Sequence, residues 1–207
     1  ISINDFTSLK KIIKIITAGM QQSNYPIKKS EMQNVISQYK KMVFKNDGIM
    51  KIGPRNFIGL SSISLEMENI LNQSNTNIVS ITKNYSVTDK ADGLRKLLFV
   101  DNQGKIYFIT MNMDVQFTGM ITKTKECYNS ICDGEHVLED KHNNYLNHYL
   151  LFDIYFLDEK DKRALPLYNK ESKDSRLYNL HAFSNKLKPT PIISNGEKDL
   201  KIKEKTF

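Results

Sequence analysis

Two short apolar runs joined by a polar connection that ends in glycine constrain the fold of this chain most strongly. Residues 97–100 and 105–110 flank the connection Asp101-Asn102-Gln103-Gly104. A connection of this length and composition is typical of a β-hairpin. Further apolar runs follow and read as strands, at residues 115–119, 130–138 and 149–157. The middle of the chain therefore predicts a mainly antiparallel sheet.

Helical periodicity flanks this strand-rich region on both sides. Apolar residues recur every three or four positions over residues 6–20 and 31–44, and again from about residue 174 until Pro189, which is the spacing of an amphipathic helix. We expect the first two helices to pack on the rest of the chain. A short helix over 66–71 and an alternating strand over 200–207 complete the elements. The predicted fold class is α+β, mainly antiparallel sheets with flanking helices.

A change in composition at Asn46-Asp47-Gly48 indicates a domain boundary, because glycine and proline punctuate the chain beyond it. We expect residues 1–50 to be a helical segment or a linker from an upstream domain, and residues 51–207 to form one domain. Residues 72–77 read as a polar loop. The chain does not begin with methionine, and we expect it to be part of a longer protein.

The charge of the chain bears on its partners. Lysine and arginine total 30 against 23 acidic residues, which gives a formal net charge of +7. Such an excess favours a polyanionic partner such as nucleic acid or nucleotide phosphates. The alternative is that a chain rich in Lys, Ile and Asn reflects an AT-rich genome, and composition alone leaves both readings open. No apolar run approaches the roughly 18 residues that cross a bilayer, so we expect no membrane partner.

Cysteine and histidine usage argues against a disulfide scaffold or a zinc site. Cys127 and Cys132 are the two cysteines, and no second Cys/His pair accompanies them at ligand spacing. We interpret them as free thiols in a reducing compartment. The four histidines are also without metal-ligand spacing and read as solvated or hydrogen-bonded residues. The sequence predicts no metal-binding cluster.

The hexapeptide Lys90-Ala91-Asp92-Gly93-Leu94-Arg95 leads into the hairpin and carries the clearest chemistry. A lysine in an apolar, partly desolvated site loses its proton more easily and becomes a nucleophile. A Lys-x-Asp-Gly sequence also makes a solvated turn, so these residues leave both interpretations open.

Two more acidic clusters lie on predicted strands. Asp133 and Glu135 belong to one, and Phe152 with Asp153 to the other. Asp153 interrupts an apolar run, where a carboxylate is costly unless it is paired. Taken singly, Asp133 fits a hairpin turn, Phe152 a core position and Asp153 a partner for a buried donor.

The three clusters together resemble the motifs of the covalent nucleotidyltransferase superfamily. Lys90 to Arg95 is similar to its first motif, Lys-x-Asp-Gly-x-Arg, and residues 133–137 and 149–153 are similar to two later ones. The superfamily includes mRNA capping guanylyltransferases and ATP- or NAD-dependent polynucleotide ligases. The resemblance implies the nucleotidyltransferase fold, the ATP-grasp-like fold of DNA ligases and capping enzymes.

A further segment distinguishes the branches of this superfamily. Residues 58–70 resemble the segment that precedes the lysine in capping enzymes, although Ser62 stands where that pattern usually has proline. We therefore favour a guanylyltransferase of the large-DNA-virus type. The alternatives are an ATP-dependent polynucleotide ligase with a lysyl-AMP intermediate and a non-catalytic scaffold derived from this fold.

The resemblance also implies roles for individual residues. Lys90 would attack the α-phosphate of GTP and hold GMP as a phosphoramidate, and Mg²⁺ or Mn²⁺ would assist. The remaining candidates divide into a substrate-binding group and a supporting group. Arg95 and Glu135 would hold the ribose, Phe152 would stack on the purine and Asp92 would support the lysine, while Asp133 and Asp153 complete the candidates as supporting carboxylates.

The same resemblance predicts partners and a location. GMP would pass to the 5′-diphosphate end of an RNA, and further capping domains, an RNA triphosphatase and a methyltransferase, would belong to the same chain or complex. Two later motifs and the OB-fold domain of the family are not found before Phe207, so we expect the domain to be incomplete at its C-terminus. A cytoplasmic location follows, in the virion or viral factory if the protein is viral.

Overall fold

One eight-stranded sheet forms the centre of the computed structural model, which describes residues 3–45, 51–70, 80–82, 85–169, 174–194 and 196–206. The strands run in the order β6-β5-β4-β1-β2-β3-β7, and β8 pairs with β5. Pairing is antiparallel throughout except between β5 and β8. The strands are β1 (Leu94–Val100), β2 (Lys105–Thr110), β3 (Val115–Ile121), β4 (Ser130–Glu139), β5 (Tyr145–Leu157), β6 (Lys160–Asp161), β7 (Thr190–Pro191) and β8 (Lys201–Glu204).

The hairpin between β1 and β2 confirms the strongest sequence prediction. The carboxylate of Asp101 accepts hydrogen bonds from the backbone N–H groups of Gln103 and Lys105, each at 2.8 Å. Gly104 has φ +82°, and a Cβ there would lie 2.2 Å from the carbonyl oxygen of Thr122. Glycine is therefore required at the end of this connection.

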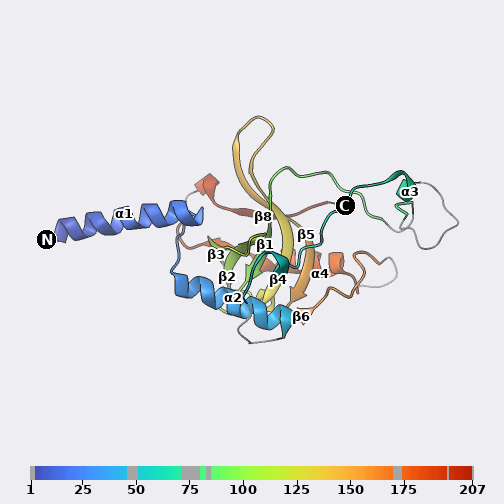
Figure 1. The fold of residues 1–207 in the computed structure, drawn as a ribbon, viewed down its shortest axis with the longest axis horizontal. Coiled ribbons are helices and arrows are strands. Elements are labelled where there is room, and N and C mark those ends of the chain that lie inside the picture. Colours follow the sequence, from blue (N-terminus) through green and yellow to red (C-terminus); the bar gives the residue numbers. More distant parts are fainter. Residues whose placement is uncertain are drawn as a thin grey trace.

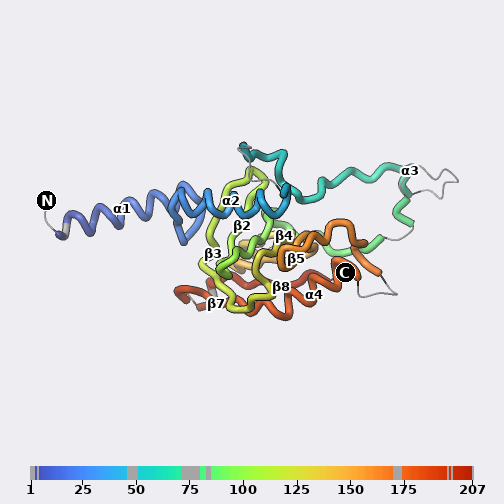
Figure 2. The backbone as a smooth tube through the Cα atoms, turned by 90° about the horizontal axis from the view of Figure 1, so that it is seen from below, coloured from blue at the N-terminus to red at the C-terminus, as the bar shows by residue number. Residues whose placement is uncertain are grey.

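Helices cover both faces of the sheet, as Figure 2 shows with α2 (Lys29–Phe44) and α4 (Arg176–Leu187) on opposite sides of the strands. On one face α2 packs its buried Val35, Tyr39 and Val43 into a core shared with β1 and β2. On the other face Leu180, Phe183 and Leu187 of α4 join a second core with residues of β1, β4 and β5. The remaining helical elements are α1 (Ile3–Gln21), α3 (Met67–Ile70) and the 3₁₀ turns Pro54–Asn56, Lys125–Cys127 and Gly196–Lys198.

The first helix does not pack as the sequence led us to expect. Figure 1 shows α1 extending away from the rest of the molecule. Its apolar residues Phe6, Leu9, Ile12, Ile13, Ile16 and Met20 are each more than half exposed. An apolar stripe at helical spacing predicts a helix, but it does not identify what covers the stripe. The expectation that both N-terminal helices pack is correct for α2 and wrong for α1.

Two irregularities in β5 position side chains of the site. In the register between β4 and β5, Cys132 lies opposite Ile154 and Ile131 opposite Phe156, so Tyr155 is skipped. One step further, Asp133 lies opposite Asp153 and Gly134 opposite Leu151, so that the register also skips Phe152. Each skipped residue is a β-bulge, which bends a strand and redirects its side chains.

The α+β class with a mainly antiparallel sheet and flanking helices is confirmed. The expected boundary at residues 46–48 and the polar loop at residues 72–77 lie outside the described residues. The division of the chain at residue 50 stays a prediction, although α2 shares its core with the sheet. Within the described ranges, no helix has the length and apolar character that crossing a bilayer requires.

Candidate functional site

Lys90 lies in an extended segment that leads into β1 and is open to solvent. Its side chain is 85% exposed, and Nζ lies 3.5 Å from Oδ1 of Asp92, whose side chain is fully exposed. An exposed ion pair of this kind contributes little to stability. The desolvated surroundings that would favour a nucleophilic lysine are therefore not formed by the described residues, and the Lys90 amine is accessible to a substrate.

Glu135 fastens the end of this segment to the sheet. Its Oε1 accepts a hydrogen bond from the backbone N–H of Gly93 at 3.0 Å. Glu135 lies directly opposite Arg95 in the pairing of β1 and β4. A Cβ on Gly93 would lie 2.6 Å from the backbone oxygen of His136, so only glycine allows this close approach. The segment that carries Lys90 therefore enters β1 next to the Glu135 carboxylate.

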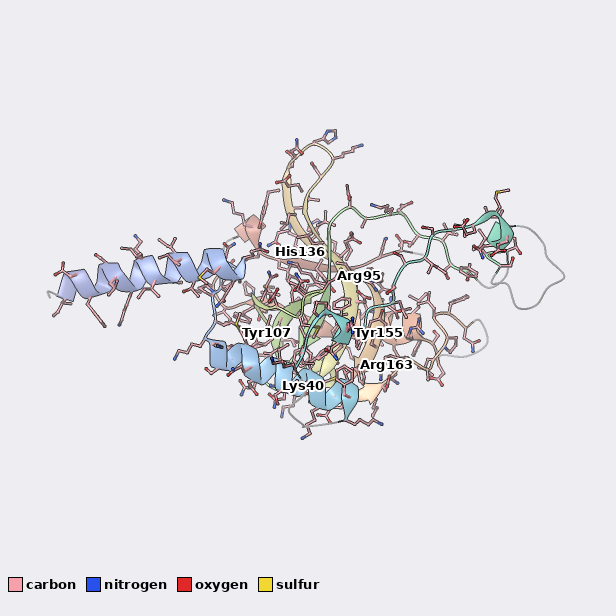
Figure 3. All side chains as sticks on the ribbon, in the orientation of Figure 1. Lys40, Arg95, Tyr107, His136, Tyr155 and Arg163 are labelled. Atoms are coloured by element: carbon pink, nitrogen blue, oxygen red, sulfur yellow. The ribbon has the colours of Figure 1, made fainter. Side chains whose placement is uncertain are left out.

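A buried ion pair between Arg95 and Asp133 forms the base of the site, and Figure 3 labels Arg95 among the strands of the sheet. Arg95 Nε donates to Asp133 Oδ1 at 3.1 Å, and a second guanidinium nitrogen donates to Oδ2 at 2.5 Å. Tyr155 donates its hydroxyl to the same Oδ2 at 2.7 Å. The hydrogen bonds to Asp133 raise the pKa of Arg95, and burial raises that of Tyr155. The network holds the arginine charged in a fixed orientation.

The segment before the lysine closes over this ion pair. Arg95 donates a further hydrogen bond to the backbone carbonyl of Leu60. The rings of Phe57 and Phe152 each lie with their centroids 5.8 Å from the Arg95 guanidinium carbon. These distances are within the range of cation–π attraction. Arg95 is therefore the point at which residues 57–60, β1, β4 and β5 meet.

Asp153 occupies a different environment from the other candidates. Its Oδ1 accepts a hydrogen bond from Nε of Arg176 at 2.8 Å, and both side chains are largely buried. Arg176 also donates to the backbone carbonyl of Leu165 at 2.7 Å. Burial raises the pKa of Asp153, while the arginine acts in the opposite direction. The structure thus joins Asp153 to α4 and the loop before it.

Of the seven residues predicted from the sequence, the structure links most through direct contacts. Arg95 contacts Asp133 and Phe152, Lys90 contacts Asp92, and Glu135 contacts the backbone of the segment between them. Sequence reasoning missed Tyr155, Phe57 and the Leu60 carbonyl. The hydroxyl of a tyrosine in an apolar run is a signal for Tyr155, because a buried hydroxyl needs a partner.

The groups in this arrangement have the chemistry that binding a phosphate or a ribose requires. It combines an accessible amine, a fixed guanidinium, a carboxylate and aromatic rings, which supply donors, acceptors and a stacking surface. Among the residues that the structure describes, no group of three or more His, Cys, Asp or Glu side chains could hold a metal ion. Protein side chains in these ranges therefore do not form a metal cage.

Comparison with known proteins places the whole of this site in one family. Residues 17–207 match the family described as mRNA capping enzyme, catalytic domain. A probable mRNA-capping enzyme of Acanthamoeba polyphaga mimivirus is 27% identical to the chain over 161 residues. That alignment covers 77% of this chain but 12% of the viral protein. The chain thus spans a small part of the length of this relative.

Proposed function

The chain belongs to the mRNA capping enzyme family through the catalytic domain, and we propose on this premise that it is an mRNA guanylyltransferase. The observation that carries the proposal is the accessible Lys90 on a segment tied to Glu135 and Arg95. The substrates would be GTP and an RNA with a 5′-diphosphate end.

The reaction would proceed in two displacements through Lys90. The amine of Lys90 attacks the α-phosphorus of GTP, a P–N bond forms, the bond to the β-phosphate oxygen breaks, and pyrophosphate leaves while the amine proton passes to solvent. A terminal oxygen of the RNA diphosphate then attacks the same phosphorus, the P–N bond breaks, and the lysine regains a proton. Two easier steps replace one difficult step.

The other residues would bind and orient the nucleotide. Arg95 is held by Asp133 and Tyr155, so its position is fixed before substrate arrives, and such preorganisation lowers the entropic cost of reaction. The Glu135 carboxylate, with one oxygen on Gly93, retains acceptor capacity for ribose hydroxyls. Phe152 supplies a ring for the purine. Asp92 would support the lysine, and Asp153 would support the fold beside the site through its pair with Arg176.

The requirement for Mg²⁺ or Mn²⁺ and the further partners belong to the same proposal. Metal ions neutralise developing phosphate charge in phosphoryl transfer, but the described residues offer no cluster of ligands that would hold one. An RNA triphosphatase and a methyltransferase would act before and after this step. The mimivirus relative favours a viral capping protein, and its location in the host cytoplasm is part of the same proposal.

Covalent labelling tests the proposal directly. The full-length protein would be incubated with GTP or ATP labelled at the α-phosphate, with Mg²⁺, Mn²⁺ or EDTA, and then denatured. We expect label from GTP to remain on the protein and to disappear in Lys90→Ala. Lys141→Ala, in the exposed tip of the β4–β5 hairpin, is the matched control and should label normally. Label from ATP alone would favour a ligase and overturn the proposal.

A further inference from the structure

A second basic residue, Lys96, comes one position after Arg95 in the sequence. It points to the other face of β1, because side chains alternate along a strand. Lys96 is 7% exposed. Its Nζ donates to Oε1 of Gln116 at 2.8 Å and lies 3.1 Å from Nδ1 of His136. The ammonium nitrogen is also 5.1 Å from the centroid of the Phe108 ring.

This geometry defines the protonation of His136. An ammonium group only donates hydrogen bonds, so Nδ1 of His136 is an acceptor and the ring is neutral. Nε2 then carries the proton and donates to Oδ1 of Asn147 at 2.8 Å. Asn147 in turn donates to the backbone carbonyl of Lys198 at 2.8 Å. The histidine therefore fixes the position of the lysine without contributing a negative charge.

Lys96 lacks a counter-ion among the described residues. No carboxylate in those ranges lies within 4.0 Å of its Nζ. Burying an ammonium group without an anion is costly, and burial lowers the pKa of Lys96 to about 8. Two of its three N–H groups have acceptors, and an anion would satisfy the third and neutralise the charge.

A cavity of about 540 Å³ lies directly in front of this cluster. Lys96, Gln116 and His136 contribute its polar wall, and the residues at 22–25 that follow α1 close one side. Leu94, Phe108, Leu138 and Tyr145 contribute apolar surface. A largely apolar cavity with a few convergent polar groups is the usual form of a small-molecule site.

We propose that this cavity binds a small organic oxyanion, a phosphate or a carboxylate, whose charge pairs with Lys96. The apolar part of the ligand lies against the Phe108 and Leu138 side of the cavity, and Gln116 and His136 hold the lysine toward the anion. The site is distinct from the candidate nucleotide site, because Lys96 and Arg95 point to opposite faces of the sheet. The proposal does not depend on guanylyltransferase activity.

Thermal unfolding with two probes tests the site. The probes are sodium phosphate and sodium benzoate, compared with sodium chloride at equal ionic strength. We expect at least one probe to give a saturable rise in Tm, of about 5–10 °C at a hundredfold excess over Kd. Lys96→Met keeps the length of the side chain and should abolish the rise, whereas Lys141→Met at the exposed hairpin tip should preserve it. Comparing the rise in Tm with phosphate and with benzoate identifies whether the site accepts a phosphate or a carboxylate.

A second measurement avoids reliance on the variant. In wild-type protein, the NMR signal of the Lys96 ε-carbon should move with ligand concentration along the same saturation curve. The proposal is overturned if neither probe raises Tm, if Lys96→Met responds as wild type does, or if the ε-carbon signal does not move. Any of these results would make Lys96 a buried amine with only a packing role.

Discussion

The Arg95–Asp133 pair offers the sharpest test of the energetics of the site, through Asp133→Asn. This substitution keeps the size of the side chain but removes its charge and one of the two acceptors that Arg95 uses. The side chain of Asp133 is fully buried and that of Arg95 is 24% exposed. Breaking a buried pair costs about 3–5 kcal/mol, because one charge remains uncompensated. Partial hydration of Arg95 reduces this cost, and we expect about 2–4 kcal/mol.

The assay is thermal or urea unfolding of wild type and variant. For a domain of this size 1 kcal/mol corresponds to about 2–4 °C, so Tm should fall by roughly 5–15 °C. Asp161→Asn is a matched control, because Asp161 makes a similar pair with Arg163 at 2.6 Å but both side chains are more than one-third exposed. Exposed pairs contribute about 0–1 kcal/mol. Equal losses in the two variants would refute the argument that burial determines the cost.

Two further predictions concern neighbouring residues. In Gly93→Ala the new Cβ would meet the backbone of His136, so we expect a loss of about 1–3 kcal/mol in urea unfolding and a lower yield of nucleotide adduct. Gly53→Ala, whose Cβ would meet no atom within 4 Å, should change neither quantity, and equal effects would contradict the steric reason. Burial lowers the pKa of His136 from 6.5 to about 4, so the folded state binds fewer protons than the unfolded state and stability falls as pH drops from 6.5 to 4. His136→Gln should flatten this part of the Tm profile, and an unchanged slope would exclude His136 as its source.

Local patterns in the sequence were sufficient to predict most of the sheet. The connection 101–104 and the apolar runs around it predict β1 and β2, because turn chemistry and alternation act over a few residues. The parallel pairing of β8 with β5 depends on contacts between distant segments, which no local pattern encodes. The exposed position of α1 is likewise not encoded locally, because hydrophobic periodicity identifies the apolar face of a helix but not the segment that packs against that face.

The residues of the candidate site likewise fall into those that a local motif identifies and those that only the fold brings together. Lys90, Arg95 and Glu135 could be identified because they stand in short contiguous motifs. The carbonyl of Leu60 and the ring of Phe57 reach Arg95 only through the fold. Lys96 was not distinguished from the many other lysines of the chain, because its burial arises from the packing of β1, β3 and β4 rather than from its neighbours in sequence.

Because of the bulges at Phe152 and Tyr155, the number of residues in β5 affects the candidate site. Phe152 and Tyr155 are three positions apart, and on a regular strand they would face opposite sides of the sheet. Both instead reach the Arg95–Asp133 pair. A single-residue deletion at either bulge would shift the register between β4 and β5 and so change which side chains of β5 reach that pair. Insertions and deletions in β5 therefore act on the site even when every motif residue is retained.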